Sequence, residues 1–387
     1  MIKKATGNGD WMVFDAMRGV VSDPYPNLDN TLFWNLSNAE RTNTGYIGFT
    51  PTGFIHQGGS GDTNTNHETY IYLAVRRGSL FPPEAGDATK VFHIKSQSNA
   101  DSYAVGFPTD LILLNKTGGS SANSYVASRL TGNDKYLITS STAAEGTSSG
   151  LWSFDGAPTQ NDFDQGASTS SAWVGWHWKR APSYFDVVAY TGTGSARTVP
   201  HGLTVPPEMI WVKRRNTTNN WKTFHSSLGG TKSMELNTTV AAETNGSALW
   251  NSTAPTASVF SLGTASDVNG SGSTYIAYLF ATLAGVSKVG SYTGNGSSSG
   301  PTVDCGFSGS PRFVLIKKAT GGTGSWYVFD SARGIVAGAE SQLYLNSTAA
   351  EQTATDQIDP TSSGFQIVIN SGGLNTNGET YIFYAIA

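Results

Sequence analysis

The sequence predicts an all-β protein made of tandem antiparallel β-sandwich-like modules of about 100 residues each. Three observations support this prediction. The chain repeats itself with a period near 100 residues, and its apolar runs are short and rich in β-branched and aromatic residues. No segment keeps a helical period for more than a turn or two. With 387 residues, the chain is long enough for several such modules.

Two independent markers define the repeat. The first is a phrase that ends in glutamate, and its copies are spaced by 105, 98 and 108 residues: Glu40, Glu145, Glu243 and Glu351. The second is the leading aromatic residue of the last strand, with spacings of 103, 102 and 106 residues: Tyr70, Trp173, Tyr275 and Tyr381. A third similarity links IKKATG at residues 2–7 to the same letters at residues 316–321. Two markers with one period predict four repeated units.

The units follow from these markers in chain order. We expect an incomplete β module at 1–85, a divergent β module at 86–182, and two further β modules at 183–284 and 285–387. The first unit begins inside the segment that aligns with the second strand of the later units, so it is expected to lack its first strands.

The fourth unit predicts six or seven strands per module. The expected strands are VGSYTG, RFVLIKKA, WYVFDS, LYLNS, FQIVI and TYIFYAIA, at residues 289–294, 312–319, 326–331, 343–347, 365–369 and 380–387. The last is almost continuously apolar, which predicts a central strand covered on both faces, whereas 312–319 is half polar and is expected nearer an edge. Tight turns are expected at three Asn-Gly steps, Asn269-Gly270, Asn295-Gly296 and Asn377-Gly378.

Composition excludes several classes of function. Charged residues make up 13% of the chain, and the net charge of -4 offers no basic footprint for nucleic acid. The single Cys305 excludes an intrachain disulfide, which suits a protein made in a reducing cytoplasm. No apolar run approaches the length of a membrane span, and the N-terminal residues do not form a signal peptide. We therefore expect no nucleic-acid partner and no membrane insertion.

Catalytic and metal-binding patterns are not found. The histidines fall at non-equivalent places in the repeats, without metal-ligand spacing: His56, His67, His93, His177, His201 and His225. Two acidic pairs, Asp162 with Asp164 and Asp356 with Asp359, lack the rest of a calcium loop. Ser148 and Ser298 stand in GxSxG strings, but a nucleophile elbow needs a strand before it and a helix after it. The sequence predicts no catalytic residue, no metal and no cofactor.

Three recurring features remain as candidates. The repeated glutamates Glu40, Glu145, Glu243 and Glu351 are interpreted as residues with a role in the fold, for example as acceptors of backbone amides in a turn. The pair Asp15 and Arg18, matched by Asp330 and Arg333, is interpreted as a local ion pair or loop brace in preference to a ligand clamp. Some tryptophans offer flat faces for sugars, although most are expected in the core: Trp34, Trp152, Trp173, Trp176, Trp178 and Trp250.

The phrases together resemble a known module. The order YTGNG at 292–296, FVLIKK at 313–318, FDSARG at 329–334, AAE at 349–351 and TYI at 380–382 is similar to the tandem β-rich repeat module of virion appendage and tail-fibre proteins of marine, cyanophage-like tailed phages. The likeness is strongest over 286–387, good over 1–74 and 187–280, and weakest over 84–180. It implies a place in a virion and no particular chemistry.

The resemblance and the composition favour a non-enzymatic structural protein of a phage virion, a fibre-like appendage or capsid decoration that contacts the host surface. Assembly in the host cytoplasm, other virion proteins as partners and a homo-oligomer are expected. The incomplete first unit is expected to be completed by a neighbouring subunit, another virion protein or residues of a longer chain. The alternative is a carbohydrate-binding β-module array that recognises a host-surface glycan, and a polysaccharide depolymerase is the third class.

Overall fold

The computed structural model describes residues 1–15, 30–42, 44–50, 53–56, 61–75, 87–97, 103–117, 123–132, 134–148, 160–161 and 172–387. Strands account for 41% of the structure and helices for 3%, and the sheets are antiparallel and form roughly repeated modules. The predicted all-β fold class is confirmed. The limits of the four units stay a prediction, and the units are named below by their order in the chain.

The fourth unit shows the plan of a module most fully. Its main sheet contains, in spatial order, β23 (Ser287–Thr293), β31 (Thr380–Ile386), β25 (Phe313–Lys318), β26 (Trp326–Asp330), β27 (Glu340–Tyr344) and β28 (Gln352–Thr355). A smaller sheet contains β24 (Thr302–Asp304), β30 (Gly364–Ile367) and β29 (Ile358–Pro360). Side chains such as Phe329, Phe365 and Phe383 pack between the two sheets. Each such pair of sheets forms a small sandwich.

The third and second units repeat this strand order. In the third, the main sheet is β15 (Phe185–Thr191), β22 (Thr274–Phe280), β17 (Met209–Arg214), β18 (Lys222–His225), β19 (Lys232–Glu235) and β20 (Glu243–Thr244), with β16 (Arg197–Pro200) and β21 (Val259–Leu262) as the smaller sheet. In the second, the strands are β7 (Phe92–Gln97), β14 (Trp173–Trp178), β9 (Leu111–Lys116), β10 (Tyr125–Ser128), β11 (Lys135–Ile138) and β12 (Gly146–Thr147), with β8 (Tyr103–Ala104) and β13 (Gln160–Asn161).

The first unit has a shorter version of the sheet. Its strands are β6 (Tyr70–Tyr72), β1 (Ile2–Lys4), β2 (Met12–Val13) and β3 (Leu32–Phe33), and β4 (Ile47–Thr50) pairs with β5 (Gly53–His56). Among the described strands, β6 pairs with β1 alone, whereas β14, β22 and β31 each have a partner on both sides. In the described sheet of the first unit, β6 is therefore an edge strand, whereas the later units have one more strand beside the corresponding position.

Strand register makes the units comparable residue by residue. The leading aromatic of each last strand lies opposite the same place in the neighbouring strand: Tyr381 opposite Lys318, Tyr275 opposite Arg214, Trp173 opposite Lys116 and Tyr70 opposite Lys4. Counting from these pairs gives each residue its counterpart in the other units. The repeat in sequence is thus also a repeat in pairing.

The tyrosine marker has a physical role in the turn before the last strand. The Tyr381 hydroxyl accepts the Thr376 amide at 2.8 Å, and the Tyr70 hydroxyl accepts the Thr65 amide at 2.7 Å. Tyr275 makes the corresponding contact five residues back along the chain. A buried amide left without a partner costs free energy, so the tyrosine holds this turn closed.

The central position of 380–387 is confirmed, because β31 lies between β23 and β25 and is buried almost throughout. The expectation that 312–319 lies near an edge is wrong. Every residue of β25 is buried, and β25 is an inner strand between β31 and β26. Lys317 is buried because it contacts another unit at the Thr239 carbonyl, and Lys318 is buried within its own unit, where it donates to the Thr376 hydroxyl. Sequence polarity alone shows neither contact.

One of the three expected Asn-Gly turns is wrong. Gly296 and Gly378 have φ of 67° and 77°, as tight turns require. Asn269 instead ends the single helical turn α1 (Ser266–Asn269), and the φ of Gly270 is -59°. The buried Asn269 amide donates to the carbonyls of Ser195 and Gly263, each at 2.7 Å. Its side chain braces two loops and does not form a hairpin.

The number of strands is also higher than predicted, with eight in the third unit and nine in the fourth. The additional strands are short: β20, β24, β28 and β29 have two to four residues each. All four residues of β28 are exposed, so no alternation of polarity marks them.

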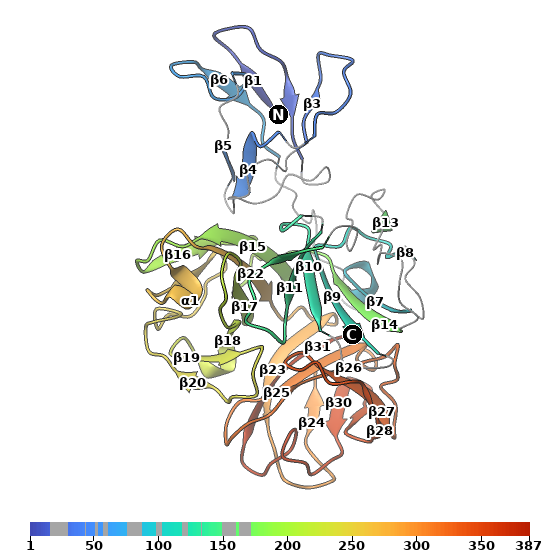
Figure 1. The fold of residues 1–387 in the computed structure, drawn as a ribbon. Helices are drawn as coiled ribbons and strands as arrows, with labels where there is room; N and C mark the ends of the chain where they lie inside the picture. Colours follow the sequence, from blue (N-terminus) through green and yellow to red (C-terminus); the bar gives the residue numbers. More distant parts are fainter. Residues whose placement is uncertain are drawn as a thin grey trace.

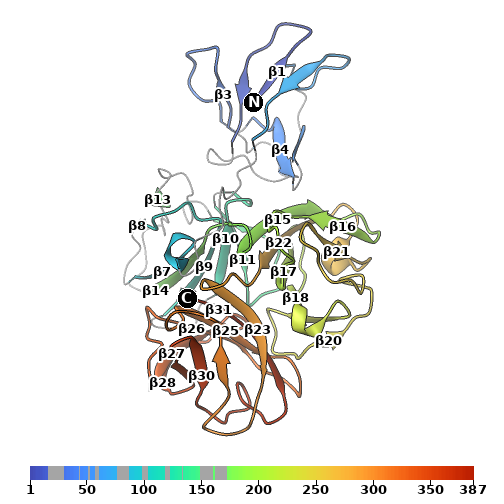
Figure 2. The ribbon, with the colours of Figure 1, turned by 180° about the vertical axis from the view of Figure 1, so that it is seen from behind.

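The second, third and fourth units gather into one body, and the first unit lies apart from it (Figures 1 and 2). The main sheets of the three units face one another at the centre of this body. The next subsection describes that centre.

Candidate functional site

The three units of the body close around one apolar core, here called the shared core. Each unit contributes alternate residues of its central strand, and none of them is more than 1% exposed: Val174, Trp176 and Trp178; Ile276, Tyr278 and Phe280; Ile382, Tyr384 and Ile386. Rings from different units touch, with centroids 5.0 Å apart for Phe280 and Tyr384 and 5.5 Å apart for Trp178 and Phe313. The main sheets of the third and fourth units thus pack on their own smaller sheets with one face and on the shared core with the other.

Polar contacts fix the third unit to the second at the rim of the shared core. The Trp221 indole donates from Nε1 to the Ile138 carbonyl at 2.9 Å. The Lys213 ammonium donates to the Thr142 carbonyl at 2.9 Å, and to the Asn219 carbonyl of its own unit. Two side-chain donors of the third unit therefore form hydrogen bonds with backbone carbonyls of the second unit.

The junction between the fourth and third units repeats this arrangement. The Trp326 indole donates to the Glu235 carbonyl at 2.9 Å, and the Lys317 ammonium donates to the Thr239 carbonyl at 2.9 Å. Trp326 corresponds to Trp221 and Lys317 to Lys213 by strand register. The same pair of donors meets the same pair of backbone sites in both junctions.

An asparagine orients the tryptophan of each donor pair. The backbone amide of Trp326 donates to Oδ1 of Asn346 at 2.7 Å, and that of Trp221 donates to Oδ1 of Asn237 at 2.8 Å. The Trp, Lys and Asn of a unit therefore form a prepared docking set.

The third junction, between the fourth and second units, uses different contacts. Asn115 and Ser124 stand in the second unit where the others have Lys and Trp, and these two residues bond to each other at 2.8 Å. Thr139 donates from its hydroxyl to the Leu345 carbonyl at 2.6 Å, and the Trp176 indole donates to Oδ2 of Asp330 at 3.0 Å. The ring of three units is thus closed, although this junction lacks the docking set.

A buried ion pair adds to the junction of the second and third units. Arg215 Nε lies 2.7 Å from Oε2 of Glu145, and the two side chains are 0% and 1% exposed. Charges buried this deeply are stable only when paired, so both must be in place for the junction to close.

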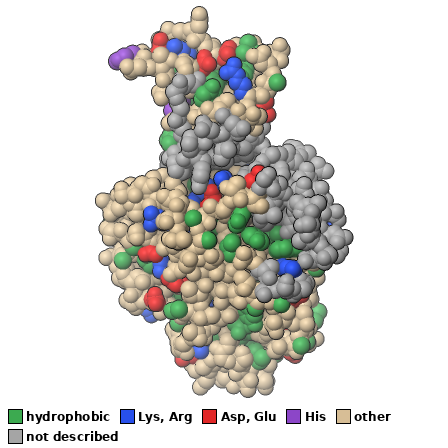
Figure 3. All heavy atoms as spheres, in the orientation of Figure 1, with side chains coloured by type: hydrophobic (Ala, Val, Ile, Leu, Met, Phe, Trp, Pro, Cys, Tyr) green, Lys and Arg blue, Asp and Glu red, His purple; other side chains and the backbone are tan. Residues whose placement is uncertain are grey.

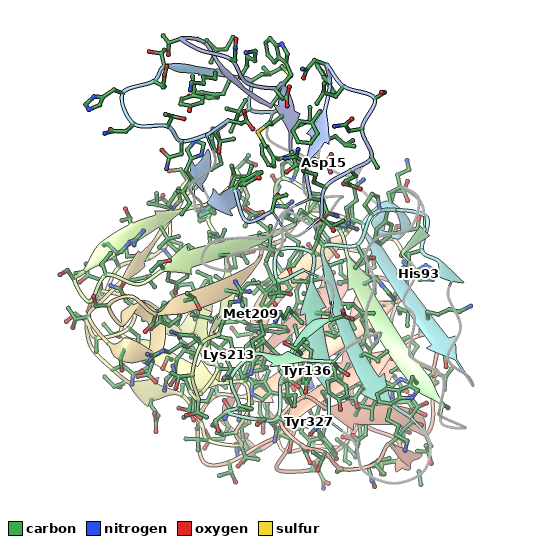
Figure 4. The ribbon with its side chains drawn as sticks, turned by 45° about the horizontal axis from the view of Figure 1, so that its top comes forward. Asp15, His93, Tyr136, Met209, Lys213 and Tyr327 are labelled. Atoms are coloured by element: carbon green, nitrogen blue, oxygen red, sulfur yellow. The ribbon has the colours of Figure 1, made fainter. Side chains whose placement is uncertain are left out.

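The two junction lysines have unusual ionisation. Burial lowers the pKa of Lys213 to about 8, and burial with the nearby Lys318 charge lowers the pKa of Lys317 to about 8. Such a lysine can serve as a nucleophile in some proteins. Here both side chains are enclosed, and their ammonium groups donate to backbone carbonyls. Figure 4 labels Lys213 and Met209 within the three-unit body, and both side chains are buried there.

The pair Asp330 and Arg333 is a loop brace, in agreement with the interpretation from sequence. Arg333 Nε lies 2.6 Å from Oδ2 of Asp330, and Nη1 lies 2.8 Å from Oε1 of Glu351. Asp330 also accepts the Trp176 indole from the second unit, a contact that sequence reasoning missed. Of the earlier copy, Asp15 is described, and Arg18 lies outside the described residues.

Two of the repeated glutamates have a role in the fold, but as partners in ion pairs and not as acceptors of backbone amides. Glu145 pairs with an arginine of the next unit, and Glu351 pairs with Arg333 of its own unit. Glu243 is exposed on β20. Glu40 is partly buried. The repeated glutamate therefore makes different contacts in different units.

The tryptophans divide as the sequence suggested. Trp173, Trp176, Trp178 and Trp250 are at most 8% exposed and belong to cores. Trp34 is 69% exposed. Trp152 lies outside the described residues, as do Asp162 and Asp164.

Within the described part of the chain, no group of three or more His, Cys, Asp or Glu side chains could hold a metal ion. Ser298 lies in the turn between the strands β23 and β24, which is not the setting of a nucleophile elbow. Burial lowers the pKa of His177 to about 3 and that of His225 to about 4, so both are neutral core residues at pH 7. No described helix is long and apolar enough to cross a membrane.

Sequence reasoning missed the docking set. Lys213 and Lys317 follow apolar runs in the phrases WVKRR and LIKKA, and Trp221 and Trp326 lie 8 and 9 residues further on. That recurrence was visible, but its meaning depends on which unit packs against which.

Comparison with known families adds one finding. A family described as a domain of unknown function (DUF7483) matches residues 88–387. The chain belongs to this family. The matched residues include all of the strands of the three-unit body, and no curated protein matches the chain. Membership in this family names no activity for the body.

Proposed function

We propose that this DUF7483 chain is a non-enzymatic structural protein of a phage virion, a fibre-like appendage or capsid decoration assembled in the host cytoplasm. The observation that carries the proposal is that buried charged side chains of the body form contacts between units. Lys213, Lys317, Arg215 and Asp330 are all engaged in contacts that join units to one another. Side chains placed in this way support rigidity and assembly, which a particle component needs.

The resemblance to phage appendage modules supplies the virion location in this proposal. Mass spectrometry and immunogold labelling of gradient-purified particles, from a culture that expresses this sequence, test it. We expect the chain at a constant ratio to the major capsid protein through successive purification steps. A chain that is abundant in the lysate and lost from the particles would refute the proposal.

A carbohydrate-binding array is the second candidate, and exposed aromatic rings favour it. Trp34 is 69% exposed and Tyr72 is 68% exposed, and such rings can stack on sugars. A glycan array with the wild-type chain and with Trp34→Ala tests this candidate. Binding that is lost in Trp34→Ala supports it, and an array without signal removes it.

A further inference from the structure

The first unit exposes a sheet face that the later units bury. On its last strand and just beyond, Ile71, Leu73 and Val75 are 51%, 56% and 83% exposed. By strand register their counterparts in the fourth unit are Ile382, Tyr384 and Ile386 of the shared core, which are at most 1% exposed. The same three positions therefore lie in a core in one unit and in solvent in the other.

Trp34 extends this face. Its amide donates to the Trp11 carbonyl, just as the Leu345 amide donates to the Trp326 carbonyl, so Trp34 corresponds to Leu345. Leu345 is 0% exposed in the shared core, and Trp34 is 69% exposed. We call Trp34, Ile71, Leu73 and Val75 the first-unit face. Figure 3 shows hydrophobic side chains among the surface atoms of the first unit. Exposed apolar side chains that share one face commonly mark an interaction site.

The first unit also carries a complete docking set. Lys3 and Trp11 correspond to Lys317 and Trp326 by strand register. The Trp11 amide donates to Oδ1 of Asn35 at 2.8 Å, which repeats the brace of the later units. Trp11 is thus held as in a unit that docks on a neighbour.

The acceptor side of the junction is present on the same unit. The carbonyls that receive Trp326 and Lys317 belong to Glu235 and Thr239, and their counterparts in the first unit are Phe33 and Ser37. A unit that carries both the donors and the acceptors can join copies of itself head to tail. Such contacts form a ring when the rotation closes.

The occupant of the first-unit face follows from these observations. The three units of the body already cover one another around the shared core. The body shows that the rotation between such units closes after three. We propose that first units from three copies of this chain form a ring around a common apolar core, which makes the protein a homotrimer through the first-unit face. Trp11 and Lys3 of each copy then donate to the Phe33 and Ser37 carbonyls of the next.

Sedimentation equilibrium of the full chain, wild type and Ile71→Asp/Leu73→Asp, tests the proposal. We expect the wild type at three times the 40.9 kDa of one chain at micromolar concentration, and the variant at a three-fold lower mass. Both residues are more than half exposed in one chain, so the variant should fold, and circular dichroism checks this. Val336→Asp, at an exposed position of the body, is the matched control and should remain trimeric.

A wild-type monomer or dimer over the whole concentration range would overturn the proposal. A trimer that persists in the double variant would overturn it as well, because the interface would then lie elsewhere. The outcome is independent of the proposed function: a trimer absent from particles would refute only the virion role, and a monomer present in particles would refute only the trimer.

Discussion

The first and fourth units contain nearly the same phrase, and the structure treats one face of it in opposite ways. IKKATG begins β1 in one unit and completes β25 in the other, and the strands pair in the same register. Trp326 is 1% exposed at a junction, whereas its counterpart Trp11 is partly exposed. The difference teaches that the phrase determines strands and turns, while neighbouring units determine which residues become core.

Truncation of the junction tryptophan should have the largest effect on this comparison. We expect Trp326→Ala to lower the free energy of unfolding by about 3–5 kcal/mol, because a buried indole and its bond to the Glu235 carbonyl are lost. Trp11→Ala should cost about 1 kcal/mol or less in a chain kept monomeric by Ile71→Asp/Leu73→Asp. Urea denaturation measures both, and equal losses would show that the two units do not differ in this way.

Removal of a repeated glutamate should lower the stability of the chain by an amount that depends on whether the glutamate is buried at a junction. Glu145→Ala leaves the Arg215 charge buried and should destabilise the chain by about 3 kcal/mol. Glu243→Ala, at an exposed site, should stay within about 0.5 kcal/mol. Thermal or urea unfolding gives both values. The double change Glu145→Leu with Arg215→Met should recover most of the loss, and failure to recover would mean that the charges matter beyond their mutual pairing.

The second and third units should lose stability as pH falls. The pKa values of His177 and His225 are lowered by burial to about 3 and 4, so below their ordinary value of 6.5 the unfolded chain binds protons that the folded chain does not. Each histidine should cost about 1.5 kcal/mol between pH 6.5 and 5. His177→Gln should therefore flatten a plot of stability against pH by that amount.

In the fourth unit, one buried side chain, Glu340, should increase the stability of the chain as pH falls. Burial raises the pKa of Glu340 to about 7, so the folded state binds an extra proton between pH 7 and 4.5 and gains stability as pH falls. Glu340→Gln should make the loss of stability on acidification steeper. A shallower curve in this variant would contradict the assignment.

The smallest effect tests a feature that both units share. Tyr381→Phe and Tyr70→Phe each remove a hydroxyl that accepts a backbone amide, and each should cost about 1 kcal/mol. Hydrogen exchange at Thr376 and Thr65 should accelerate in the respective variants. A much larger effect in one unit would show that the turn depends on its neighbours as well as on the tyrosine.

Sequence alone determined the fold class and the repeat, because β-branched runs, turn residues and the TY marker act over a few neighbouring residues. Tyr381, Tyr275 and Tyr70 hold the same turn wherever the phrase occurs. Local patterns could not reveal that β25 is an inner strand, because a lysine such as Lys317 predicts an exposed position and is buried in the structure.

Only the tertiary structure decided what the repeated letters do at the unit boundaries. Lys317 donates to Thr239, 78 residues away, and Trp176 donates to Asp330, 154 residues away. Burial of these groups depends on the closure of three sheets around one core, and that closure joins residues far apart in the chain. The same phrase therefore gives a covered face in the fourth unit and an exposed face in the first.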